Sequence, residues 1–328
     1  MLRYLRNVLI AFAFAAGAIF FCFLSRRLPE PIAPYEIRSE RADFIAEKTA
    51  GSVRIASVNC KNYLTTNRYT SDGKYKRRWA KPLAEREAMW QAFAVVRPDV
   101  VALQEIGEEK HLDELTADLL RKYGLEFPYK VCLSGRDTHR RIGIISRIPF
   151  EQILRYPEPE KMSRGLLGVE LLAGARSLYV FTLHLKSKIS RSEDDPECAR
   201  ERLDEARCVG KILAEYTNEY CVLLGDFNDL PESPPVQSVA RESAMKRVDL
   251  KDSRGESWTY RYLKMNEKRI FDHLFVSPKT ERIKVPQSGK IADDDWAKKV
   301  LPDGQTVYAS DHRMIFVDLL FPKESSEN

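Results

Sequence analysis

The sequence lacks the spaced motifs that mark several common classes of site. None of its six cysteines has C-x-x-C spacing, which argues against a zinc site. It contains no G-x-x-x-x-G-K nucleotide loop and no G-x-S-x-G nucleophile elbow, and it shows no internal repeat or low-complexity tract. These absences leave no signal for a P-loop site or a covalent serine route, so the chemistry must come from residues dispersed along the chain.

The composition is that of a globular protein with one large domain or two ordinary ones. The 328 residues are 44% hydrophobic and 31% charged. The net charge of +5 is compatible with a phosphate-bearing substrate, but solvated lysines are the simpler explanation of so mild an excess.

Residues 1–27 differ from the rest of the chain. After the basic MLRYLRN, an unbroken apolar run extends from Val8 to Leu24, and two arginines close it. This run is longer than the core of a secretory signal and shorter than the roughly 20 residues of a spanning helix. The bulky IFFCFL after its alanines argues against cleavage. We therefore expect a transmembrane signal anchor, with a cleaved signal as the alternative, and an exported C-terminal part.

The remainder divides into a proline-containing linker at 28–50, one domain at 51–322 and a tail at 323–328. Within the domain, short apolar strands alternate with longer amphipathic helices, and Gly124 is the expected stop of one helix. Several strands are apolar on both faces, so a second sheet and helices should cover them. We therefore expect an α/β fold, built as a layered sandwich.

The segment VLLGDFNDLP raises a question that the fold alone does not answer. An apolar run typical of a buried strand ends in Asp226 and Asn228, although a buried carboxylate is costly unless it is paired or binds a metal. Because strand side chains alternate, both point the same way, with Phe227 on the opposite face. Polar residues stand at the ends or entries of other apolar strands as well: Asn59, Glu105, His184, Asp272, Asp311 and His312.

The types of these residues fit one chemistry. Carboxylate and amide oxygens without thiolates suit a hard cation such as Mg²⁺ or Mn²⁺. Two histidines with aspartates offer His–Asp pairs around a phosphate. Because phosphoryl transfer to water requires a metal and positioned donors, the sequence predicts a metal-dependent hydrolase that cleaves phosphoesters with an activated water.

The ordered series Asn59, LQE105, His184, GD226FN228, Asp272 and SD311H312 resembles the endonuclease/exonuclease/phosphatase superfamily. That superfamily includes pancreatic-type deoxyribonucleases, apurinic-site endonucleases, sphingomyelinases and inositol-polyphosphate phosphatases. The resemblance covers nearly all of residues 51–322. It implies a four-layer α/β sandwich, two packed mixed sheets flanked by helices, with the active site at one edge of the sheets.

The resemblance also implies roles by position. Glu105 would hold the metal, with Asn59 beside it and Asp311 contributing. Asp226 would position or deprotonate the attacking water, and Asn228 would hold a phosphate oxygen.

The remaining roles concern the phosphate and the leaving group. His312, oriented by Asp272, would stabilise the charge that develops on the phosphate. His184 would contact the phosphate or the leaving oxygen, and Arg164 resembles an arginine that many members place against the scissile phosphate. Where pancreatic-type enzymes pair the matching histidine with a carboxylate, this chain has Arg140 or Arg141.

Two basic clusters bear on the substrate. GKYKRRW carries Lys74, Lys76, Arg77 and Arg78 among aromatics, and SGRDTHRR carries Arg136, His139, Arg140 and Arg141. The second corresponds to a loop that enters the DNA minor groove in pancreatic-type nucleases, which predicts weak sequence selectivity. Solvated surface charge is the competing explanation for both.

Three functions remain open at this point. The first is a nuclease with nucleic acid as its substrate. The second is a lipid or small-molecule phosphoesterase of the sphingomyelinase or phosphatase kind, acting at the membrane. The third is a non-catalytic binding module, which is disfavoured because every expected catalytic position is filled. No protein partner is indicated, and we expect a monomer.

Overall fold

The computed structural model of the chain describes residues 48–70, 73–158, 160–190, 192–262 and 265–322. The expected anchor at 1–27, nearly all of the linker at 28–50 and the tail at 323–328 lie outside the described residues. Within the described ranges, no helix has the length and apolar character needed to cross a membrane.

The first of two six-stranded sheets has the strand order β15-β18-β1-β4-β6-β5. In that order its strands are Lys290–Ile291, Ile315–Leu319, Val53–Tyr63, Val100–Ile106, Arg141–Ser146 and Tyr129–Leu133. The central pair β1 and β4 is parallel, and every other pair in the sheet is antiparallel.

The second sheet has the order β11-β14-β10-β9-β8-β7. In that order its strands are Lys246–Arg247, Asp272–Val276, Tyr220–Asp226, Arg176–His184, Leu166–Ala173 and Phe150–Tyr156. Its central pair β10 and β9 is parallel and the rest is antiparallel, which repeats the pattern of the first sheet.

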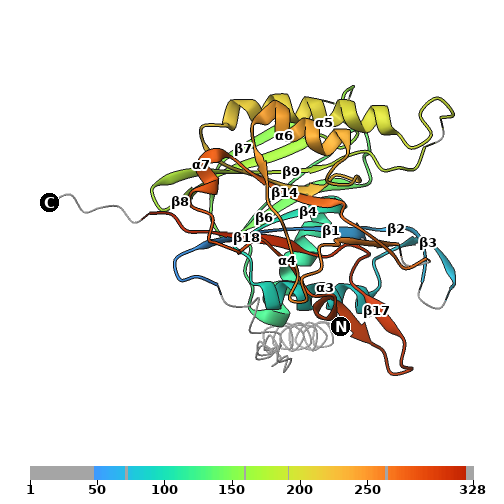
Figure 1. Cartoon of the computed structure of the whole chain (residues 1–328). Helices are drawn as coiled ribbons and strands as arrows, with labels where there is room; N and C mark the ends of the chain where they lie inside the picture. Colours follow the sequence, from blue (N-terminus) through green and yellow to red (C-terminus); the bar gives the residue numbers. More distant parts are fainter. Residues whose placement is uncertain (1–47, 71–72, 159, 191, 263–264, 323–328) are drawn as a thin grey trace, which may run out of the picture.

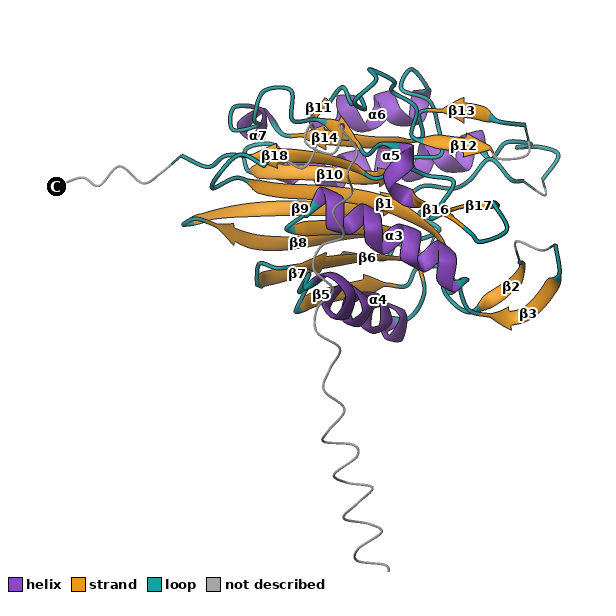
Figure 2. Cartoon of the chain, turned by 90° about the horizontal axis from the view of Figure 1, so that it is seen from below, coloured by secondary structure: helices purple, strands orange, loops and turns teal. Residues whose placement is uncertain are grey.

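The two sheets pack face to face, and helices cover their outer faces (Figures 1 and 2). Residues such as Ile55, Ile144, Val180 and Leu224 fill the apolar layer between the sheets. Helices α3 (Leu83–Val96) and α4 (Glu109–Tyr123) bury their apolar faces against the first sheet. Helices α5 (Ala199–Leu213) and α6 (Pro234–Ser243) do the same against the second.

These elements confirm the predicted α/β fold with mixed sheets. The helix α4 ends where the sequence predicted, because Gly124 adopts a left-handed conformation with φ of 64° and its N–H returns to the last turn. The single turn α7 spans Pro278–Glu281, and two 3₁₀ turns span Ala214–Tyr216 and Asp294–Ala297.

Three small hairpins extend the loops and were not predicted. They are β2 (Thr66–Tyr69) with β3 (Tyr75–Trp79), β12 (Tyr260–Tyr262) with β13 (Glu267–Arg269), and β16 (Lys298–Val300) with β17 (Thr306–Tyr308). Their strands are short and mostly exposed or half-buried, so they carry little of the hydrophobic alternation that marks a strand in sequence.

Candidate active site

Two parallel strand pairs, one in each sheet, bring most of the predicted residues to one edge of the sandwich. In the first sheet Asn59 of β1 lies opposite Gln104 of β4, one residue before Glu105. In the second sheet Asp226 of β10 lies between His184 of β9 and Asp272 of β14. The carboxyl ends of parallel strands meet at the same edge, so residues distant in sequence become neighbours.

The tight backbone of β10 explains the glycine that precedes Asp226. Gly225 has φ of 155°, and a Cβ added there would lie 2.2 Å from the carbonyl oxygen of Leu183. Asp226 then ends the strand with its side chain only 1% exposed, while Phe227 packs into the outer core against α5 and α6. This is the alternation that the sequence predicted.

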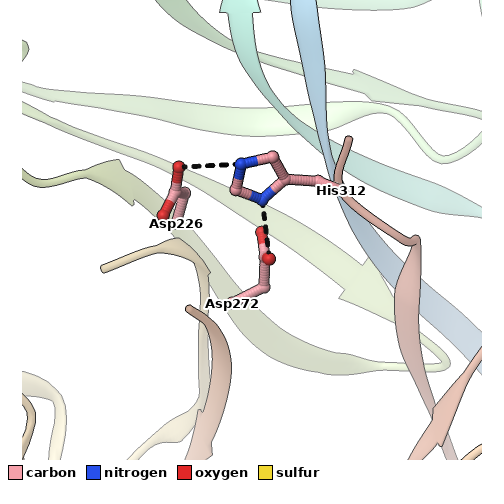
Figure 3. A group of neighbouring side chains, drawn as sticks. All are labelled: Asp226, Asp272 and His312. Carbon is pink, nitrogen blue, oxygen red and sulfur yellow. Dashed lines mark hydrogen bonds and ion pairs between the residues drawn. The ribbon is translucent and has the colours of Figure 1, made fainter. Parts of the chain in front are cut away.

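Asp226, Asp272 and His312 form a buried hydrogen-bonded group (Figure 3). The imidazole Nδ1 of His312 lies 2.8 Å from Asp272 Oδ2, and its Nε2 faces Asp226 Oδ2 at 3.7 Å. The backbone N–H of Asp272 donates to Thr259 Oγ1 at 2.9 Å, which fixes the start of β14. The ring of His312 therefore stands between two carboxylates in a defined orientation.

The electrostatics of this group favour a charged imidazole. Burial by itself lowers the pKa of His312, but the carboxylates of Asp272 and Asp226 outweigh burial and raise that pKa to about 10. For Asp226 burial is the largest influence and raises the pKa to about 7, with the His312 cation opposing the rise and Asp272 adding to it. At neutral pH His312 holds a proton, and Asp226 lies near its titration point.

Asn59 and Glu105 approach the same group from the first sheet. The amide Nδ2 of Asn59 donates to Asp226 Oδ2 at 2.9 Å, and its Oδ1 accepts the N–H of Lys61. Glu105 sits on an irregularity of β4 with φ of 55°, and its Oε2 accepts the N–H of Asn62 at 2.9 Å. A β-bulge re-aims the side chain that it carries, and backbone strain in a non-glycine residue is concentrated at functional sites.

Asp311 lies beside this arrangement. The preceding hydroxyl, Ser310 Oγ, donates to the carbonyl oxygen of Asn59 at 2.7 Å and also lies 3.3 Å from Asp311 Oδ1. The negative charge of Asp311 contributes to the raised pKa of His312. The structure thus places Asn59, Glu105 and Asp311 on the side of Asp226 that faces the first sheet.

His184, Asn228 and Arg164 gather on the other side of Asp226. His184 Nε2 lies 3.4 Å from Asp226 Oδ2, and burial together with the positive charges of Arg164 and His312 holds the pKa of His184 well below its usual value. Asn228 Nδ2 and Arg164 Nη1 both donate to the carbonyl oxygen of Leu185, at 3.0 and 3.2 Å. His184 Nδ1 and Arg164 Nε are buried without a hydrogen-bond partner among the described residues.

Of the basic cluster at 136–141, Arg140 reaches the site. Its Nε donates to Asn62 Oδ1 at 2.9 Å, and its charge contributes to the lowered pKa of His184. Arg136 instead pairs with Glu201 of α5 and donates to Ser163 Oγ at 3.2 Å. Arg140 therefore lies close enough to influence His184, whose Nδ1 has no hydrogen-bond partner among the described residues.

Comparison with known protein families gives the family of the chain. A model of the Endonuclease/Exonuclease/phosphatase family matches residues 72–312, which is well over half of the chain. The chain belongs to this family. Its members are phosphoester hydrolases.

Solved structures of similar fold come from several organisms. Sphingomyelinase C from Streptomyces griseocarneus is 15% identical, with a TM-score of 0.58 over 82% of this chain and 99% of that one. D. rerio TDP2 complexed with single strand DNA product is 21% identical, with a TM-score of 0.57 over 81% and 98%. A mutant beta toxin from Staphylococcus aureus with bound magnesium ions is 15% identical, with a TM-score of 0.58 over 81% of this chain and 99% of that one. No curated protein gave a significant match.

Two parts of the candidate active site carried no signal in the sequence. Tyr260 of β12 places its ring 4.8 Å from that of His312 and 5.0 Å from that of Phe271. Burial raises the pKa of Tyr260 to about 12, and Asp311, Asp226 and Glu105 add to the rise. Nothing in WTYRY marks a strand end, so only the tertiary structure reveals this neighbour.

The second unpredicted part lies beneath the site. Gln104 is completely buried, and its Nε2 donates to Thr182 Oγ1 of the opposite sheet at 2.9 Å and to Ser57 Oγ at 3.1 Å. This polar bridge links β1, β4 and β9 below the strand ends. Gln104, which precedes Glu105 in the LQE segment, therefore helps to hold the two sheets in register beneath the candidate active site.

Proposed function

We propose that this chain is a divalent-metal-dependent phosphodiesterase that hydrolyses phosphodiester bonds with an activated water, and that its substrate is nucleic acid. The observation that carries the proposal is the Asp226–His312–Asp272 group, held 2.9 Å from the amide of Asn59 beside Glu105. Each of these side chains is supplied by a different strand or loop. A fold that needed only stability would have no use for so many buried ionisable groups at one edge.

The donor set fits a hard cation on the side of the first sheet. Glu105 offers a carboxylate, Asn59 an amide oxygen and Asp311 a second carboxylate, and oxygen ligands of this kind suit Mg²⁺ or Mn²⁺. Asp226, Asp272 and His312 are also close enough to hold an ion. We assign the cation to Glu105 because a His312 imidazolium has no lone pair to donate and repels a cation. A bound cation would withdraw charge from the phosphate oxygens.

The protein side chains divide the remaining work. Asp226, whose pKa burial raises to about 7, accepts a proton from the attacking water near neutral pH. The His312 imidazolium, held by Asp272, stabilises the negative charge that develops on the phosphate. Asn228, Arg164 and His184 lie together at Leu185 and Asp226, where they can orient a phosphate oxygen or the leaving group.

A lipid phosphodiesterase is the second candidate. Two of the similar folds are a sphingomyelinase C and a beta toxin. We also propose that the N-terminal segment anchors the protein in a membrane with the domain exported, which would place the site near headgroups. The most exposed aliphatic side chains of the described residues, Ile189, Met265 and Val300, lie in three separate segments of the chain and form no continuous run, so nucleic acid remains the first proposal.

The test offers the full chain three substrates in Mg²⁺ or Mn²⁺: supercoiled plasmid, single-stranded RNA and micellar sphingomyelin. We expect cleavage of nucleic acid that EDTA abolishes and that Asp226→Asn and His312→Ala both lose. Cleavage of sphingomyelin alone would move the assignment to a lipid phosphodiesterase. Cleavage that persists in both variants would contradict the assigned site, and no cleavage of any substrate would contradict the proposal. Protease accessibility of the domain in intact cells tests its export.

A further inference from the structure

The hairpin of β2 and β3 projects from the edge of the sandwich at the end of β1 (Figures 1 and 2), and several of its aromatic and basic side chains are exposed. Tyr69, Tyr75 and Trp79 are 72%, 51% and 48% exposed. Tyr69 and Tyr75 are cross-strand partners whose ring centroids lie 5.2 Å apart, and Lys76 Nζ lies 5.6 Å from the Trp79 ring. Apolar rings left in water on a short hairpin contribute nothing to the core and indicate a surface that binds a partner.

The hairpin is connected to the proposed metal ligand through a short series of hydrogen bonds. Arg68 of β2 donates to the carbonyl oxygens of Asn62 and Leu64 at 2.8 and 2.6 Å. The N–H of Asn62 in turn donates to Glu105. Just after β3, Lys81 Nζ donates to the carbonyl oxygen of Lys61 at 3.2 Å. Both strands of the hairpin are therefore fixed to the bulged end of β1, next to Glu105.

We propose that this hairpin is a stacking platform for single-stranded nucleic acid, which delivers the scissile phosphate to the active site. The proposal rests on the phosphodiesterase function proposed above and narrows its substrate. Exposed bases of a single strand stack on aromatic rings without regard to sequence, and lysines and arginines follow the phosphates. The exposed Arg77 and Arg78 supply positive charge beside Trp79. In a duplex the bases are already stacked, so the rings would have no faces to contact.

The composition of the hairpin favours nucleic acid over a lipid surface. Residues 66–79, TNRYTSDGKYKRRW, contain no aliphatic side chain and no phenylalanine. A loop that inserts into the acyl region of a bilayer generally carries leucine or phenylalanine beside tryptophan. Tyrosine, tryptophan and arginine are by themselves the side chains that stack on bases and pair with phosphates.

Binding is measured by fluorescence anisotropy with the full chain carrying Asp226→Asn, which separates binding from cleavage. The probes are fluorescein-labelled dT12 and a 12-base-pair duplex. We expect tighter binding of dT12 than of the duplex, and a loss of about tenfold or more in dT12 affinity for Trp79→Ala and for the double variant Tyr69→Ala/Tyr75→Ala. Trp79→Phe retains a stacking ring and should keep most of the affinity. Arg77→Gln should reduce the salt slope by about 0.7.

Tyr129→Ala is the matched control, because Tyr129 is an exposed aromatic that pairs with Ser146 at the opposite end of the first sheet. It should leave dT12 binding unchanged. Equal affinity of the hairpin variants and the parent would overturn the platform. So would hairpin variants that lose hydrolysis of micellar sphingomyelin but bind dT12 normally, which would indicate a lipid surface.

Hydrolysis of bis(p-nitrophenyl) phosphate distinguishes the two proposals. This substrate is too small to bridge the hairpin and the site, so the hairpin variants in the wild-type background should hydrolyse it at the parental rate. If the parent hydrolyses it and the hairpin variants still bind dT12 normally, only the platform fails. If the parent does not hydrolyse it or any nucleic acid, the phosphodiesterase fails, whatever the binding result.

Discussion

The contact between Asp272 and His312 allows a prediction about pH as well as rate. The carboxylate lies 2.8 Å from Nδ1, and both side chains are buried. Asp272→Asn keeps the shape but removes the charge. Breaking a buried pair by removing one partner costs about 3–5 kcal/mol. At about 1.4 kcal/mol for each pKa unit, a loss of about 4 kcal/mol from the charged form would lower the pKa of His312 from about 10 to roughly 7.

This shift has a defined effect on catalysis if protonated His312 stabilises the transition state. At pH 6 both enzymes would hold the proton, and the variant would show only the loss due to a less well oriented ring. At pH 9 the wild type would remain mostly protonated, whereas roughly one molecule in a hundred of the variant would. The ratio of wild-type to variant kcat should therefore rise about a hundredfold between pH 6 and pH 9.

The assay is hydrolysis of bis(p-nitrophenyl) phosphate at saturating Mg²⁺, with kcat and KM determined separately across this range. Asp249→Asn is the matched control, because that carboxylate is 83% exposed and pairs with Arg247 at the surface. Its rate should follow the wild type at every pH. A constant ratio between wild type and Asp272→Asn from pH 6 to pH 9 would refute the reasoning that Asp272 keeps His312 charged.

Three further predictions concern other parts of the site and its support. Glu105→Gln should raise the Mg²⁺ concentration for half-maximal activity at least tenfold without changing the circular dichroism spectrum, and an unchanged Mg²⁺ requirement would exclude Glu105 as a ligand. Gly225→Ala should lower the free energy of unfolding by more than about 3 kcal/mol, because the added Cβ would lie 2.2 Å from the carbonyl oxygen of Leu183. Gly174→Ala adds a Cβ in open space and should cost about 1 kcal/mol. Equal effects of the two substitutions in chemical denaturation would contradict this close approach. Burial lowers the pKa of His273 to about 4, so the stability gained from its neutral form is full above the unfolded pKa near 6.5 and is lost as the pH falls towards 4. Relative to His273→Gln, the wild type should therefore lose about 3 kcal/mol of unfolding free energy over that interval. Parallel stability curves for the two proteins would disprove this prediction.

The strand ends were readable in the sequence because a buried strand imposes a simple pattern. An apolar run that closes on a carboxylate, as at Asp226, violates the pattern in a way that burial makes expensive. The violation therefore indicates a candidate functional residue before any of its partners is known. Asp272 and His312 follow the same logic, and the structure places them in contact across 40 residues of sequence.

What the sequence did not reveal depends on tertiary geometry. Glu105 and Asn62 both have positive φ angles, yet neither is a glycine whose presence would announce such a conformation. Tyr260 reaches His312 from a three-residue strand in a loop region, too short to show periodicity. The role of Gln104 as a bridge between sheets requires knowing which strands face each other, and pattern alone does not supply that.

The unpaired atoms of the site give the last step of the argument. His184 Nδ1, Arg164 Nε and Asp272 Oδ1 are all buried without hydrogen-bond partners among the described residues, although each would be expected to cost about 1–3 kcal/mol in a finished core. All three belong to residues that surround Asp226 or neighbour its contacts. Two are potential donors and one is an acceptor, which is the complement that a phosphate and a water molecule require. The cost is consistent with a site whose hydrogen bonds are completed only when substrate binds.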